Sequence, residues 1–250
     1  MLFGDYHTHT PFSHGKSTIE ENVQIAESLG LKEIAITDHG FGHIAMGMKR
    51  RDVPKMKKQI AFCNEKYNVK TLFGVEANII SRQGDVDFRS DEVGIFDVIL
   101  CGYHKGVWGK TWSEFWKFIA RNNYNNMFRE ARCFDYIAEY TKTYIEVIKK
   151  NTIDVLTHLN HDIYIDPVEV AKCARDYGTY VELNSKRQHF TDDILCEIAN
   201  TGVEFIISSD AHHCKRVGDV DLAMTQVKRV GLDFKKIVNI DRFPSFRSKQ

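Results

Sequence analysis

The amino-acid sequence predicts an α/β fold, a distorted (β/α)7 barrel, in a single domain that spans residues 1–250. Short runs rich in β-branched and aromatic residues alternate along the chain with helical patterns. Such runs suit strands that are buried on both faces of a parallel sheet. The length is common for one α/β barrel, and no repeat or long polar linker divides the chain. An open doubly wound sheet is the structural alternative.

The expected strands are four to eight residues long, and polar residues stand where most of them end. Parallel strands require a crossover between them, and the intervening helical patterns supply it. Seven strands are expected, at residues 2–7, 33–38, 70–77, 96–103, 154–158, 180–184 and 204–210.

The helical patterns begin and end at recognisable residues. Asp166-Pro167 is a cap followed by a first-turn proline, and Gly178 stops the same helix. A Ser-Thr-x-x-Glu cap begins the first helix and Gly30 ends it. The expected helices are Ser17–Leu29, Val53–Tyr67, a long stretch Trp112–Lys150 that we divide into two helices, Pro167–Tyr177, Thr191–Asn200 and Asp219–Val230.

Composition excludes several classes of function. Positive and negative charges balance at 34 each, which disfavours a nucleic-acid partner or a membrane surface. The sequence contains no apolar run long enough for a membrane span and begins with no signal-peptide pattern. Six cysteines form no C-x-x-C pair, so we expect reduced, buried thiols in a cytoplasmic protein. A homo-oligomer remains open.

Histidines and carboxylates gather at the expected strand ends. In α/β barrels the active site forms at the carboxyl ends of the strands, so these side chains should converge there. Clustered imidazoles with two carboxylates are the ligands that borderline divalent metals require. A lone strand-end histidine is more often structural, but six strands contribute together. The candidate metal ligands are His7, His9, His14, His39, Glu76, His104, His158, Asp210 and His212.

The order of these residues, with Thr37-Asp38-His39 and Ser209-Asp210-Ala211-His212, resembles the PHP (polymerase and histidinol phosphatase) family. The resemblance runs from residue 5 to residue 212 and matches all nine ligand positions of that family. Among its branches, the chain is most similar to the standalone YcdX-type phosphatases, and next to histidinol-phosphate phosphatases. The family fold is a distorted TIM-like barrel.

The resemblance implies three divalent metal ions, most commonly zinc, with manganese or iron as alternatives. It implies that His7, His9, Glu76 and Asp210 hold the first ion and that Glu76 bridges to a second. His104 and His158 would complete the coordination of the second ion, and His14, His39 and His212 would hold the third. Glu76, Asp210 and His212 are the expected catalytic residues.

The expected reaction is hydrolysis of small-molecule phosphate monoesters by a metal-bridging hydroxide. Arg187 is the main candidate for clamping phosphate, because a guanidinium binds phosphate oxygens in pairs. Asn184, Lys105 and His43 are further substrate-binding candidates, and His189 lies in a loop on the same face. Asp38 should either orient an imidazole or cap its loop.

Other functions stay open at this point. Histidinol phosphate is one specific substrate, and a phosphodiesterase or exonuclease is a second enzyme class. A non-catalytic metal-binding module is the least favoured alternative, because such a protein should lack some ligands. The three tryptophans, Trp108, Trp112 and Trp116, predict either a buried helix face or a lid over the pocket.

Overall fold

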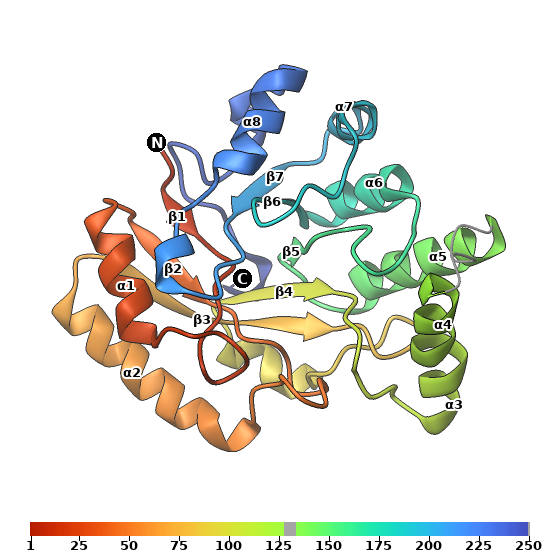
Figure 1. Ribbon diagram of the computed structural model, residues 1–250, viewed down its shortest axis with the longest axis horizontal. Helices are drawn as coiled ribbons and strands as arrows, with labels where there is room; N and C mark the ends of the chain where they lie inside the picture. The colour runs from red at the N-terminus through yellow and green to blue at the C-terminus, as the bar shows by residue number, and fades with distance from the viewer. Residues whose placement is uncertain (128–133, 250) are drawn as a thin grey trace.

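Seven parallel strands in the order β1 to β7 form the centre of the computed structural model, which describes residues 1–127 and 134–249. Each strand pairs with the next strand along the chain, and helices surround the sheet (Figure 1). This arrangement confirms the predicted barrel. The strands are β1 (Gly4–Asp5), β2 (Glu33–Ile36), β3 (Lys70–Asn78), β4 (Val98–Gly102), β5 (Val155–Leu156), β6 (Tyr180–Asn184) and β7 (Phe205–Ser208).

The barrel closes between β7 and β1 mainly through side chains. The buried carboxylate of Asp5 accepts hydrogen bonds from the backbone N–H of Ser209 at 3.2 Å and of Gly218 at 2.9 Å. Asn239 is also buried, and its amide donates to the Gly4 carbonyl on β1 and the Ile207 carbonyl on β7. Polar side chains thus join the two edge strands where no continuous ladder does.

β1 and β5 are two residues long, shorter than the sequence predicts. Beyond them the backbone makes isolated contacts instead of a regular ladder. Thr8 forms a single bridge with Ala211, and the Thr157 N–H donates to the Cys101 carbonyl at 3.0 Å. The chain remains parallel to its neighbours here, and the histidines that follow lie at the same end of the barrel.

The helices largely begin and end where the sequence places them. Thr18 and Glu21 form a capping box at the first helix, and Asp166 caps the helix that Gly178 ends in a left-handed conformation. The long helices are α1 (Ile19–Ser28), α2 (Val53–Lys66), α5 (Phe134–Lys150), α6 (Pro167–Tyr177), α7 (Asp192–Asn200) and α8 (Asp221–Val230).

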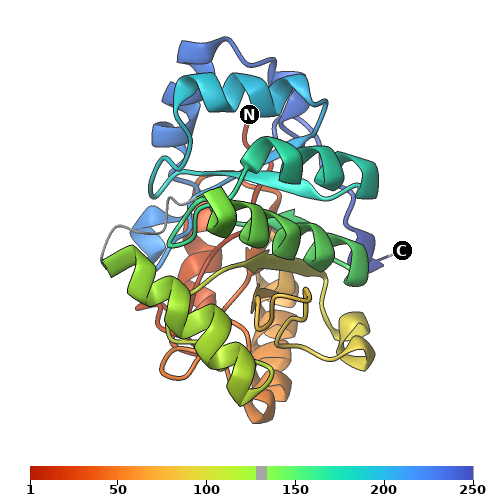
Figure 2. The same cartoon turned by 90° about the vertical axis from the view of Figure 1, so that its right-hand side faces the viewer.

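The stretch predicted as two helices from residue 112 to 150 begins with α3 (Trp112–Glu114), a π-helical segment (Phe115–Ala120) and α4 (Arg121–Met127). Residues 128–133 lie outside the described residues. The side chains of Trp108, Trp112 and Trp116 are 51%, 65% and 55% exposed, so the prediction that they form a buried helix face is wrong. The β3 and β4 arrows point toward this part of the molecule (Figure 1), and Figure 2 shows it from that side.

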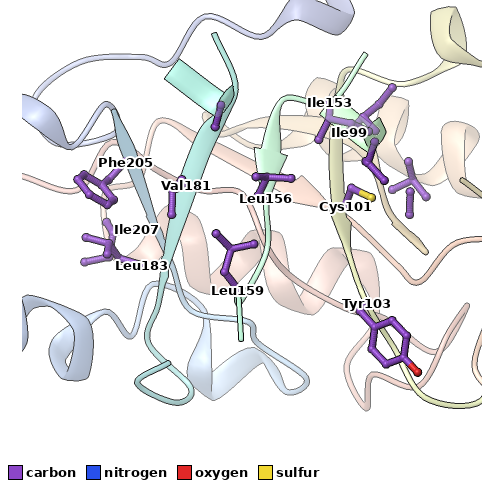
Figure 3. Close-up of a cluster of buried hydrophobic side chains, with 14 of the residues drawn as sticks. Ile99, Cys101, Tyr103, Ile153, Leu156, Leu159, Val181, Leu183, Phe205 and Ile207 are labelled. Carbon is purple, nitrogen blue, oxygen red and sulfur yellow. The ribbon is translucent and has the colours of Figure 1, made fainter. Parts of the chain in front are cut away.

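The hydrophobic core consists of two clusters, one inside the barrel and one between the strands and the surrounding helices. Inward-facing residues such as Leu72, Leu100 and Ile206 fill the barrel interior. Outward-facing residues, including Val181, Leu183 and those around them in Figure 3, belong to the cluster that also contains helix residues. Because side chains alternate along a strand, the inward polar residues of β3 and β6 come to lie at one end of the apolar interior.

The cysteines are more varied than expected. Cys63 and Cys101 are buried, Cys173 and Cys214 are half-buried, and all are free thiols. Cys196 is exposed, so the prediction of buried thiols is wrong there, and Cys133 lies outside the described residues. None of the helices within residues 1–127 and 134–249 is both long and apolar enough to cross a membrane.

Candidate metal centre

Glu76 lies at the centre of the predicted ligand set. Its side chain is 1% exposed, and imidazoles from four other strand ends surround its carboxylate. The distances from Glu76 oxygens are 2.8 Å to His158 Nε2, 3.0 Å to His104 Nε2, 2.9 Å to His39 Nδ1 and 3.3 Å to His7 Nε2. One carboxylate can therefore serve donors from β1, β2, β4 and β5.

A second group of imidazoles lies beside it. The ring centroids of His14 and His212 are 4.2 Å apart, those of His9 and His212 are 4.3 Å apart, and those of His14 and His39 are 4.8 Å apart. Asp210 reaches His9 Nε2 at 3.5 Å and His212 Nδ1 at 3.2 Å. All nine predicted ligands thus lie in one cluster at the carboxyl ends of the strands.

The donor atoms fit divalent metal ions. Three overlapping groups have ligand atoms within 4.8 Å of one another: His9, His14, His39 and His212; His7, His9 and Glu76; and His39, Glu76 and His104. Buried polar atoms normally have hydrogen-bond partners, and leaving one without is costly. Here His39 Nδ1 and Glu76 Oε2 lie 2.9 Å apart, but neither forms a hydrogen bond with the other or with any other described residue. The buried Nδ1 atoms of His9, His14, His104 and His158 also have no hydrogen-bond partner among the described residues.

The electrostatics favour the forms that bind metal. Burial lowers the pKa of His14 and of His104 to about 3, which keeps both imidazoles neutral. Burial would raise the pKa of Glu76, but surrounding imidazoles, His104 first, hold it well below its usual value. His7 differs, because the carboxylates of Glu76 and Glu182 overcome burial and raise its pKa. Metal binding would displace the proton of His7.

β6 carries no predicted ligand but supports three of them. The Glu182 carboxylate accepts a hydrogen bond from His7 Nδ1 at 2.7 Å, which leaves His7 Nε2 facing the cluster. The same carboxylate accepts the His158 N–H at 2.8 Å. The Asn184 amide donates to Glu182 at 3.1 Å and to Asp210 at 3.3 Å. Outer partners of this kind fix the orientation of metal-binding imidazoles.

Asp38 caps the loop between His9 and His14, and within the described residues it forms no hydrogen bond to an imidazole. Its carboxylate accepts the backbone N–H of Thr10 at 2.7 Å, and the hydroxyls of Thr10 and Ser13 donate to it as well. Burial raises the pKa of Asp38 to about 6. These bonds hold the loop between His9 and His14, so of the two predicted roles the structure favours the cap.

The cluster forms one wall of a pocket of about 350 Å³. The predicted substrate-binding residues Arg187, Asn184, Lys105 and His43 all line it. The Nζ of Lys105 forms an ion pair with Asp162 at 2.5 Å, and the polar atoms of Asn184 are already hydrogen-bonded. The guanidinium of Arg187 has no ion-pair partner among residues 1–127 and 134–249. His161, Asp162, Lys186 and His189 complete this side of the pocket.

Sequence reasoning missed Glu182 and Asp162. Glu182 has a recognisable signal, a carboxylate in the middle of the apolar strand Tyr180–Asn184 where a buried charge requires partners. Asp162 has none, because its contact with Lys105 depends on how two loops meet. In the sequence, Lys186 stood out only as one of the basic residues after the sixth expected strand. In the structure, its ammonium lies 3.3 Å from Asp210 and 3.2 Å from His212.

Comparison with known proteins gives a consistent result. The model of the PHP domain family matches residues 5–240. A probable phosphatase of Aliivibrio fischeri is 31% identical, over 97% of this chain and 92% of the relative. A probable phosphatase of Vibrio parahaemolyticus is 29% identical, over 94% and 88%. A similar solved structure is the crystal structure of histidinol phosphate phosphatase from Lactococcus lactis, complexed with zinc, L-histidinol and phosphate. The match has a TM-score of 0.62 and 17% sequence identity, and it includes 100% of this chain and 98% of the chain of that structure.

Proposed function

This chain belongs to the PHP domain family, and from that premise we propose that it is a metal-dependent phosphatase that hydrolyses small phosphate monoesters. One observation carries the proposal. All nine predicted ligands lie in a single cluster, and within it His39 Nδ1 and Glu76 Oε2 face each other without a hydrogen bond to any described residue. The probable-phosphatase relatives support the same reaction class.

The donor set suits up to three divalent ions, with zinc the first choice because imidazole predominates. His7, His9, Glu76 and Asp210 would hold the first ion, Glu76, His104 and His158 the second, and His14, His39 and His212 the third. When bound, such ions activate water near neutral pH and neutralise charge on phosphoryl oxygens.

The residues of the chain then have separate tasks. Glu76 keeps imidazoles from four strands at hydrogen-bonding or ion-pair distance, so it fixes the spacing of the centre. Glu182 holds His7 with Nε2 facing inward. Arg187 is an exposed residue of the pocket lining. It supplies a positive charge at the solvent-exposed, open side of the pocket, where an anionic substrate must enter.

The pocket supports a small substrate over a polymer. Its volume of about 350 Å³ lies at the lower end of the range for small-molecule sites. The formal net charge of +0 gives little attraction for a nucleic-acid backbone, which counts against an exonuclease. We also propose a single domain and a cytoplasmic location; the free thiols of the described cysteines are usual in a reducing compartment.

The test combines metal analysis with activity. Protein stripped by chelation should hydrolyse no phosphate ester, and zinc, manganese or iron should restore activity at about three equivalents per chain. Phosphate release from a panel of monoesters and diesters, with matched metal content, measures the reaction class. Activity that survives complete removal of metal would refute the proposal, and hydrolysis restricted to diesters would replace it with a phosphodiesterase.

A further inference from the structure

The charged residues of the pocket divide unevenly between its metal side and its open side. Three carboxylates line the pocket: Glu76, Asp162 and Asp210. Glu76 and Asp210 belong to the proposed metal centre, and Asp162 is paired with Lys105 at 2.5 Å. Among the described lining residues, no carboxylate is left to bind a positively charged group of a substrate.

In contrast to the carboxylates, one positively charged residue at the solvent-exposed side of the pocket is not engaged in an ion pair within the described chain. Arg187 follows β6, its side chain is exposed, and its guanidinium has no ion-pair partner in the described chain. Its backbone N–H donates to the Asn184 Oδ1 at 3.3 Å, which anchors the turn that presents it. A planar guanidinium with free donors is suited to a second carboxylate or phosphate.

Two imidazoles flank this side of the pocket. The rings of His161 and His189 lie 5.2 Å apart, and each lies within 6 Å of the His158 ring, at 5.1 Å and 5.9 Å. Both rings line the pocket, and an imidazole N–H can donate a hydrogen bond to an anionic group bound there.

From this distribution we propose that the pocket selects phosphate esters whose alcohol part carries a second anionic group, a carboxylate or another phosphate, and that Arg187 recognises that group. The inference rests on the proposed phosphatase function and narrows its substrate class. Amino-alcohol phosphates, including histidinol phosphate, are disfavoured because their ammonium group meets Arg187 and no free carboxylate.

The experiment compares esters of similar size that differ in the charge of the alcohol. Phosphoglycerate carries a carboxylate, glycerol phosphate is uncharged beyond its phosphate, and phosphoethanolamine carries an ammonium. Metal-loaded protein should show the highest kcat/KM for phosphoglycerate, by about tenfold over glycerol phosphate, and the lowest for phosphoethanolamine. p-Nitrophenyl phosphate reports hydrolysis that does not depend on the alcohol's charge.

Arg187→Gln should reduce the ratio of kcat/KM for phosphoglycerate to that for glycerol phosphate to about one. Arg187→Lys should keep part of the preference. Lys110→Gln is the matched control, because it removes one positive charge outside the pocket lining, where Lys110 pairs with Asp85. It should leave the ratio unchanged.

Two results would overturn the proposal alone: hydrolysis of all esters without a charge preference, or a uniform loss in Arg187→Gln with the ratio intact. The second would mean that Arg187 binds the transferred phosphoryl group. If the metal-loaded protein hydrolyses none of the four esters, the phosphatase function itself is refuted and this proposal falls with it.

Discussion

β6 and β7 are neighbours in the barrel, but they contribute to the proposed metal centre in different ways. Residues Val181–Asn184 pair in register with Phe205–Ser208. β7 is apolar up to its last residue, Ser208, and the predicted ligands Asp210 and His212 follow the strand. β6 instead carries Glu182 inside the strand, 1% exposed, and no predicted ligand. The predicted ligands follow one strand, and the other strand supplies hydrogen bonds to predicted ligands of neighbouring strands.

Backbone strain explains why such support matters. His158 and Asp210 are predicted ligands with positive φ angles of 28° and 50°, a conformation that costs non-glycine residues about 1–3 kcal/mol each. Both are contacted by β6: Glu182 accepts the His158 N–H, and Asn184 donates to the Asp210 carboxylate. The difference between the strands predicts a graded series of mutational effects.

The largest effect is expected at Asp210, which follows β7. Asp210→Asn removes a predicted charged ligand and should lower kcat/KM by roughly 10³-fold, together with loss of bound metal. Asp241→Asn is a matched control, since Asp241 is exposed and, within the described residues, its carboxylate forms an ion pair with the N-terminal amine alone. Metal content and phosphate release are measured on the same samples. A variant with full metal content and full activity would remove Asp210 from the centre.

A smaller effect is expected in the interior of β6. Glu182→Gln places an amide N–H₂ where His7 Nδ1 or the His158 N–H now donates, so one donor loses its acceptor. Metal affinity should fall about 10- to 100-fold. Competition with a chelator measures the affinity, and thermal unfolding of metal-free protein measures stability separately. Unchanged affinity with reduced stability would show that Glu182 supports only the fold.

The comparison also shows what the sequence can reveal. His7, His39, His104 and His158 were predictable as a cluster because parallel strands bring their carboxyl ends together, whatever the loops do. Glu182 was not singled out, because a rule that looks for polar residues after a strand passes over one inside it. The helix end at Gly178 was predictable, since its left-handed backbone suits glycine.

Loop contacts were beyond the sequence. The pairing of Lys105 with Asp162 joins residues 57 positions apart, and it depends on a loop in which Asn160 and Asp162 also have positive φ angles. The amides of Asn122 and Asn126 on α4 both donate to the Asp162 carbonyl and hold that loop. No local periodicity encodes such a set of contacts. The contacts on the substrate side of the pocket could therefore be identified only from the structure.

The smallest effect is expected at Asn184, and it separates the two tasks of β6. The Asn184 amide donates to Glu182 and Asp210, while its Oδ1 accepts the N–H of Lys186 at 2.9 Å and of Arg187 at 3.3 Å. Asn184→Ala removes the hydrogen bonds that the amide donates and those that its oxygen accepts. It should lower kcat/KM about fivefold, mostly by raising KM, because the turn that carries Arg187 loosens.

Asn184→Asp distinguishes the two sets of bonds. The carboxylate can still accept the N–H groups of Lys186 and Arg187, but it places a third negative charge beside Glu182 and Asp210. The KM effect should therefore be smaller than in Asn184→Ala, while metal-free protein should unfold at lower temperature. Zinc should raise that unfolding temperature more than in the wild type, because bound cations relieve the repulsion between carboxylates. Equal KM values in both variants would mean that Asn184 acts on Asp210 and not on the turn, and β6 would then have a single task.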